Sequence, residues 1–183
     1  MTAESDALAP SPGGLRRALE ALYDISAGLA ALCMVALLVM VLLSIVGRQL
    51  AFHVPGTDAY AGYLMAGAGF LALAHTLKRG EHIRVTVILG TLHGRTRRAL
   101  ELWALAAATV LAGLFAFYSV RLAWQSHLLN DVSTASDATP LWIPQLSMAA
   151  GTVVMLVALI DELVLEWRGQ RTGAWNPEAS HNE

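Results

Sequence analysis

The sequence consists of four long apolar runs separated by shorter polar stretches. The longest run, 25–47, contains no charged residue, and the runs over 60–77, 102–120 and 142–160 contain few polar residues. Each run reaches or nearly reaches the roughly 20 residues that a helix needs to cross about 30 Å of hydrocarbon. The short alternating segments typical of transmembrane strands are missing. The pattern therefore predicts an all-α, integral membrane four-helix protein.

The predicted membrane domain covers residues 25–165, between a cytoplasmic N-terminal tail (1–24) and a cytoplasmic C-terminal tail (166–183). Within it we expect transmembrane spans at about 25–47, 58–77, 101–124 and 142–165. Segment 81–89, between the second and third spans, is too short to cross the bilayer, and its charges gather at its start. We expect a short interfacial segment there; an extension of the third span is the alternative.

Lys and Arg residues gather in alternate connections. Two precede the first span, six stand between the second and third, and two follow the fourth; the first connection has only Arg48 and the third, 126–141, has none. Loops rich in Lys and Arg remain in the cytoplasm. We therefore expect a multi-pass protein of the bacterial inner membrane with both termini cytoplasmic. Trp103 and Trp124 bracket the third span, as aromatic residues do at the headgroup level.

Composition and the positions of titratable residues exclude several function classes. The chain of 183 residues is 56% hydrophobic and 14% charged, with a formal net charge of −2, and its dispersed basic residues exclude nucleic acid as a partner. Ionisable residues crowd the span ends, so no ion relay crosses the bilayer. His75 is the only histidine in a predicted span, which leaves no pair of haem ligands at one depth. We expect no cofactor, no metal and no enzymatic activity.

Small residues are frequent in the second span. Four of them are candidates for helix packing with a partner subunit: Gly62, Ala66, Gly69 and Ala72. Small side chains let helix backbones approach closely in lipid, where close packing drives association. Packing among the chain's own helices is the other interpretation.

Short motifs stand at the ends of the second and fourth spans. The second span is followed by Arg79-Gly80-Glu81-His82-Ile83-Arg84-Val85, and further motifs occupy 56–65, 70–85 and 139–145. These stretches resemble the small membrane subunit of tripartite ATP-independent periplasmic (TRAP) transporters, and the resemblance covers roughly residues 25–165. It implies a family motif at the cytoplasmic face, formed by Arg79, Gly80, His82, Ile83 and Arg84.

The sequence differs from the family pattern at the start of the second span. Many members of the family have a Trp and paired Glu residues there, whereas this sequence reads Gly56-Thr57-Asp58-Ala59-Tyr60. We expect Asp58 to fill the acidic role and Tyr60 the aromatic one. Asp58, Asp131 and Asp137 lie in or beside the connections predicted to be periplasmic. They belong either to plain solvated loops or to a surface that orients a binding protein.

The resemblance also implies a function. It indicates an accessory small permease subunit of a sodium-coupled, binding-protein-dependent secondary transporter for organic acids, such as dicarboxylates. Its partners would be the large membrane subunit, which it braces, the periplasmic substrate-binding protein, and the lipid bilayer. The alternative is a membrane anchor or redox subunit of a respiratory-type complex, which the histidine depths disfavour.

Overall fold

The computed structural model describes residues 14–52, 55–78, 95–134 and 138–168 and is 88% helical. Its helices are α1 (Gly14–Gln49), α2 (Thr57–Lys78), α4 (Arg95–Leu128) and α5 (Trp142–Trp167). Within the described ranges the only β-type pairing is an isolated bridge between Val132 and Pro140. The predicted all-α, four-helix membrane fold is confirmed. The predicted interfacial segment, 81–89, lies outside the described residues.

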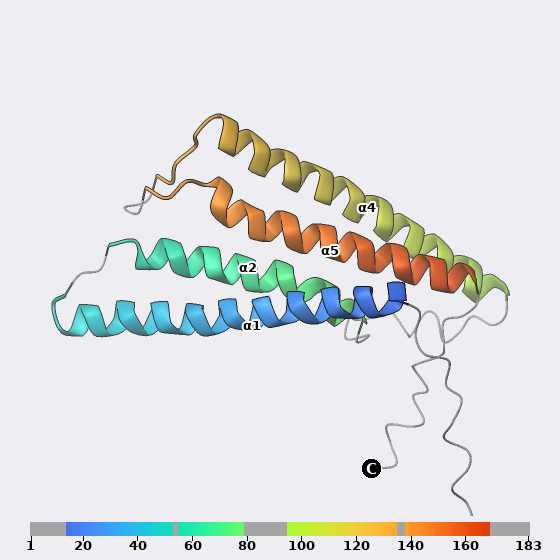
Figure 1. Ribbon diagram of the computed structural model, residues 1–183, viewed down its shortest axis with the longest axis horizontal. Coiled ribbons are helices and arrows are strands. Elements are labelled where there is room, and N and C mark those ends of the chain that lie inside the picture. Colours follow the sequence, from blue (N-terminus) through green and yellow to red (C-terminus); the bar gives the residue numbers. More distant parts are fainter. Residues whose placement is uncertain (1–13, 53–54, 79–94, 135–137, 169–183) are drawn as a thin grey trace, which may run out of the picture.

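The four helices form a single layer rather than a closed bundle (Figure 1). α1 packs against α2, α2 against α5, and α5 against α4, so that α1 and α4 form the two edges. The layer consists of two antiparallel hairpins, α1–α2 and α4–α5, and α2 lies parallel to α5 where they meet. The loops of both hairpins lie at one end of the layer, here called the connection end. The described chain begins and ends at the opposite end, here called the terminal end.

Helices α1 and α4 begin before the spans predicted from the apolar runs. α1 starts at Gly14 rather than near 25, and α4 starts at Arg95 rather than near 101. No proline or glycine interrupts 15–27, so the helix continues through polar residues that an apolar count leaves out. The 36 residues of α1 correspond to about 54 Å. Its first turns therefore extend beyond about 30 Å of hydrocarbon.

Three of the described helices, α1, α4 and α5, are long and apolar enough to cross a membrane. The remaining helix, α2, has 22 residues and is not one of these three candidate spans. α2 runs between α1 and α5 along the layer (Figure 1), which places it at their depth. Its role as a span thus follows from its neighbours more than from its own hydropathy.

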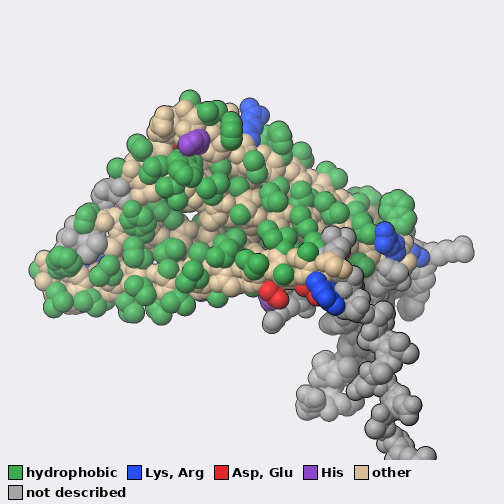
Figure 2. All heavy atoms as spheres, viewed as in Figure 1, with side chains coloured by type: hydrophobic (Ala, Val, Ile, Leu, Met, Phe, Trp, Pro, Cys, Tyr) green, Lys and Arg blue, Asp and Glu red, His purple; other side chains and the backbone are tan. Residues whose placement is uncertain are grey.

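The core of the layer is thin and built from small side chains. Alanines supply most of the buried apolar positions: Ala30, Ala68, Ala74, Ala116, Ala123, Ala149 and Ala158. Large aliphatic side chains point outward instead; Leu32 of α1, for example, is 63% exposed. Figure 2 shows hydrophobic side chains over most of the visible face, with few charges among them. A layer that hides so little of its apolar surface requires lipid or another subunit to cover it.

The turn after α1 requires a glycine. The Phe52 amide donates a hydrogen bond to the Gly47 carbonyl (2.8 Å), and the chain passes through Ala51 with φ of 54°. A Cβ atom on Gly47 would lie 2.6 Å from the Phe52 carbonyl oxygen. The bare Gly47 backbone therefore lets the chain fold back toward α2.

Candidate functional site

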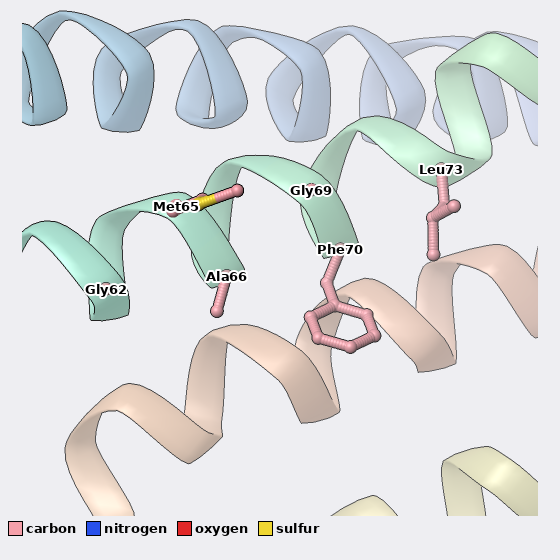
Figure 3. A pocket seen from close by; sticks show the side chains of 6 residues that line it. All are labelled: Gly62, Met65, Ala66, Gly69, Phe70 and Leu73. Carbon is pink, nitrogen blue, oxygen red and sulfur yellow. The ribbon is translucent and has the colours of Figure 1, made fainter.

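An apolar groove of about 460 Å³ lies along α2 (Figure 3). Its lining residues all belong to that helix: Gly62, Met65, Ala66, Gly69, Phe70 and Leu73. In Figure 3 the side chains of Ala66, Phe70 and Leu73 point toward α5, and Gly62 and Gly69 leave the backbone of α2 bare at their positions. This surface contains three of the four small residues predicted to contact a partner.

The small residues of α2 divide between two sides of the helix. Gly62 and Gly69 have open space where a side chain would be. Gly67 faces the opposite way, since a Cβ there would lie 3.4 Å from Cys33 Sγ of α1 and from Ser147 Oγ of α5. Ala72, the fourth candidate, is half-buried outside the groove lining. Internal packing and an open surface therefore both occur, on different faces.

The wall of the groove depends on a close crossing of α2 and α5. Gly151 of α5 lies directly under Phe70, and a Cβ atom on Gly151 would lie 2.5 Å from the Phe70 carbonyl carbon. The Phe70 ring meets the Phe115 ring of α4 with centroids 5.9 Å apart. The missing side chain of Gly151 thus lets α2 approach α5 and lets Phe70 reach α4.

Polar side chains tie the α4–α5 loop to the start of α2 at the connection end. The Tyr63 hydroxyl donates a hydrogen bond to Ser133 Oγ (2.9 Å), and the hydroxyls of Tyr60 and Thr139 lie 3.1 Å apart. The Leu141 amide donates to the Asp131 carbonyl at 3.0 Å. The two tyrosines pack edge to face with ring centroids 6.1 Å apart. These contacts hold the described part of the α4–α5 loop against the beginning of α2.

The three acidic residues singled out by sequence differ in their placement. Asp58 is exposed in the first turn of α2, where its carboxylate accepts a hydrogen bond from Ser44 Oγ (3.5 Å). Asp131 is half-buried in the α4–α5 loop. Asp137 lies outside the described residues. The fold brings Asp58 and Asp131 to the same end of the layer (Figure 1).

A protein-family model for the DctQ component of tripartite ATP-independent periplasmic transporters matches residues 37–169. The chain belongs to the DctQ family. A search of curated proteins finds no match. DctQ proteins are small permease components of TRAP transporters, a family of transporter components rather than enzymes. The suspected family is thereby confirmed, and the redox-subunit alternative is not supported.

The DctQ chain also has a charged cluster at the terminal end that sequence reasoning missed. Lys78 of α2 forms ion pairs with Asp161 and with Glu162 (3.2 Å), both on α5. The Lys78 ammonium also lies 5.4 Å from the centroid of the Tyr23 ring of α1. In the sequence, Lys78 stands at the cytoplasmic end of the second predicted span, and the oppositely charged Asp161 and Glu162 stand at the same end of the fourth. Without knowing that α2 and α5 are neighbours, this pattern could not be assigned to a contact.

This cluster joins α1, α2 and α5 at the terminal end of the layer. The side chains of Lys78 and Asp161 are only 23% and 26% exposed, so the pair is screened less than a surface ion pair. Beside it, the buried ring of Tyr23 packs with Ala74 of α2 and Ala158 of α5. The cluster positions the groove by fixing α2 against both neighbours.

Two features noted in the sequence, the family motif and His75, are not assigned to the groove. The family motif Arg79, Gly80, His82, Ile83 and Arg84 lies outside the described residues. His75 is described, and its Nδ1 lies 3.9 Å from an Asp24 carboxylate oxygen. In the described part of the DctQ chain, no group of three or more His, Cys, Asp or Glu side chains is placed to hold a metal ion.

Proposed function

We propose that this chain is the accessory small permease subunit of a sodium-coupled, binding-protein-dependent transporter for organic acids. Membership in the DctQ family supports the role of small permease component. The sodium coupling and the organic-acid substrate rest on the resemblance described above. In this role the chain braces the static part of the large membrane subunit and carries no substrate itself.

The observation that carries the proposal is the open groove on α2. Bare backbone at Gly62 and Gly69 lets a foreign helix approach closely, which is how helices associate in lipid. Phe70 in the groove lining is backed by the close contact with Gly151 of α5. We assign the groove, with Ala66 at its centre and Ala72 beside it, to contact with the large subunit.

Transport should require all three components. When the chain, the large subunit and the binding protein are reconstituted in liposomes, we expect uptake of a radiolabelled dicarboxylate driven by an inward sodium gradient. Liposomes with the chain alone should show only background uptake, because its charges lie at the ends of its helices. The proposal is wrong if the lone chain supports gradient-driven uptake, or if omitting it leaves uptake by the other two unchanged.

The connection end is the proposed periplasmic surface. Most of the described Lys and Arg residues stand at the opposite end of the layer, Arg48 and Arg121 being the exceptions, and loops rich in Lys and Arg remain cytoplasmic. We propose that Asp58, Asp131 and Asp137, with the polar α4–α5 loop, form a platform that orients the periplasmic binding protein. Exposed charges at such a surface act mainly on encounter and orientation.

One labelling experiment tests both the orientation and the platform. In a Cys33→Ala background, Thr134→Cys places an exposed thiol in the α4–α5 loop, and Thr96→Cys places one at the start of α4. In intact cells, an impermeant thiol reagent should label Thr134→Cys and spare Thr96→Cys. In the reconstituted complex, saturating binding protein should slow labelling of Thr134→Cys severalfold.

Two outcomes would contradict these expectations separately. Labelling of Thr96→Cys from outside would reverse the orientation. Labelling of Thr134→Cys at the same rate with and without binding protein would remove the platform from this chain. Ser126, in the same region, is unsuitable for such a probe because it is only 3% exposed.

A further inference from the structure

Helix α4 forms one edge of the layer and has two chemically different sides. The side that packs against α5 carries four small buried residues: Ala116, Ser119, Ala123 and Ser126. Their spacing of three and four residues places them on one stripe of the helix. The opposite stripe is exposed and large: Trp103, Val110, Leu114, Phe117, Arg121 and Trp124. Arg121 is the one charged residue of this outward stripe.

Arg121 lies close to one end of the apolar zone of α4. Trp103 and Trp124 are separated by about 31 Å of helix, close to the thickness of the hydrocarbon. Arg121 is one turn, about 4.5 Å, to the inner side of Trp124. The Cα–Cβ bonds of a helix tilt toward its N-terminus, so the Arg121 guanidinium needs either a polar partner at this depth or a side chain that bends back to the headgroups. No salt bridge in the described part of the chain includes it.

The other edge of the layer has no such residue. Outward positions of α1 are aliphatic, such as Leu32, Val35 and Leu38, and no charged residue occurs over 25–47. An aliphatic edge is well suited to lipid chains. Between the two tryptophans, the α4 edge carries exposed Phe117 and Tyr118 beside Arg121, and aromatic residues and arginine are enriched at protein interfaces.

The groove on α2 is continuous with this edge of α4. Phe70, which lines the groove, contacts Phe115 of α4. From Phe115, two steps of three residues lead along α4 through the exposed Tyr118 to Arg121. Each step turns about 60° around the helix, toward the outer edge. A partner that fills the groove can therefore extend over Phe115 and Tyr118 onto Arg121.

We propose that Arg121 pairs with a carboxylate of the large membrane subunit, so that this subunit covers the groove and the α4 edge while lipid covers the α1 edge. The inference rests on the proposed function, because the partner is the same. A phospholipid phosphate is the competing acceptor, because an arginine near a span end can reach the headgroups; the aromatic residues beside Arg121 and the continuity with the groove favour the protein partner. The guanidinium can hold a carboxylate through two parallel hydrogen bonds, a geometry that fixes orientation as well as affinity.

Photo-crosslinking locates the partner without altering Arg121. A photoreactive amino acid is placed in the intact complex at Met65 in the groove, at Tyr118 on α4, or at Leu38 on α1 as the matched edge control. We expect adducts with the large subunit from Met65 and Tyr118 and none from Leu38. Adducts from Met65 but not from Tyr118 would overturn the inference and leave the proposed function standing. Adducts from neither position would overturn both.

The charge itself is tested by Arg121→Gln. We expect the affinity of the large subunit for the tagged chain to fall about tenfold or more, as when one member of a buried charge pair is truncated. The thermal midpoint of the isolated chain should not change, because the outward stripe of α4 packs against no other described helix. Unchanged affinity would overturn the pairing, and so would a loss of bound anionic phospholipid with affinity for the large subunit intact.

Discussion

Replacing Gly151 by alanine is expected to destabilise the isolated chain, and replacing it by leucine should prevent the layer from forming. A Cβ atom at this position meets the backbone of Phe70, which cannot move aside as the end of a flexible side chain can. Overpacking in a well-packed core costs roughly 1–3 kcal/mol. The gain in helix propensity from glycine to alanine, about 1 kcal/mol, offsets only part of this. The measurements are the thermal midpoint and the monodispersity of the purified protein in detergent.

Gly69→Ala is the matched control for that loss. The same chemical change is made on a neighbouring helix, but nothing lies within 4 Å of the added Cβ atom. Its midpoint should equal or exceed that of the unaltered chain, because alanine is the better helix former. If Gly151→Ala melts like Gly69→Ala, then α2 and α5 do not cross as closely at Phe70 as described here.

Replacing Gly69 or Gly62 by leucine should leave the isolated chain folded but prevent its assembly with the large subunit. Leucine fills the groove from the side that a partner helix must approach, so close backbone contact is lost. We expect co-purification of the large subunit to fall at least about tenfold, which corresponds to about 1.4 kcal/mol. Sodium-driven uptake should fall in parallel. The isolated variants should melt no lower than the original chain, since both sites are open in it.

Comparing the buried Gly67 with the open Gly62 and Gly69 separates damage to the chain itself from loss of assembly. Gly67→Leu, on the buried side of α2, should damage the chain itself, because a side chain there meets Cys33 and Ser147. If Gly62→Leu and Gly69→Leu assemble and support full uptake, the groove faces lipid and the large subunit binds elsewhere. If they unfold the isolated chain, the groove belongs to the internal packing of the layer.

Hydrophobic patterning determined the number of helices in the described chain and their order along the sequence. This succeeded because charge-free runs of some 20 residues leave the backbone no other way to satisfy its hydrogen bonds in lipid. α1 and α4 begin before the predicted spans, since helices continue through polar residues once they leave the hydrocarbon. α2 lies between α1 and α5 in the layer although it is not one of the three helices long and apolar enough to cross a membrane.

The sequence by itself also indicated that small residues of the second span allow close packing, within the chain or against a partner, and its short motifs already resembled the correct family. It did not determine which glycines face the chain's own helices and which face outward. Gly67 and Gly69 are two residues apart, yet one touches α1 and α5 and the other is open. Only the order of helices across the layer, α1–α2–α5–α4, makes that distinction. The same order brings Lys78 to Asp161 and turns Arg121 outward, because contacts between distant segments follow from packing and not from local periodicity.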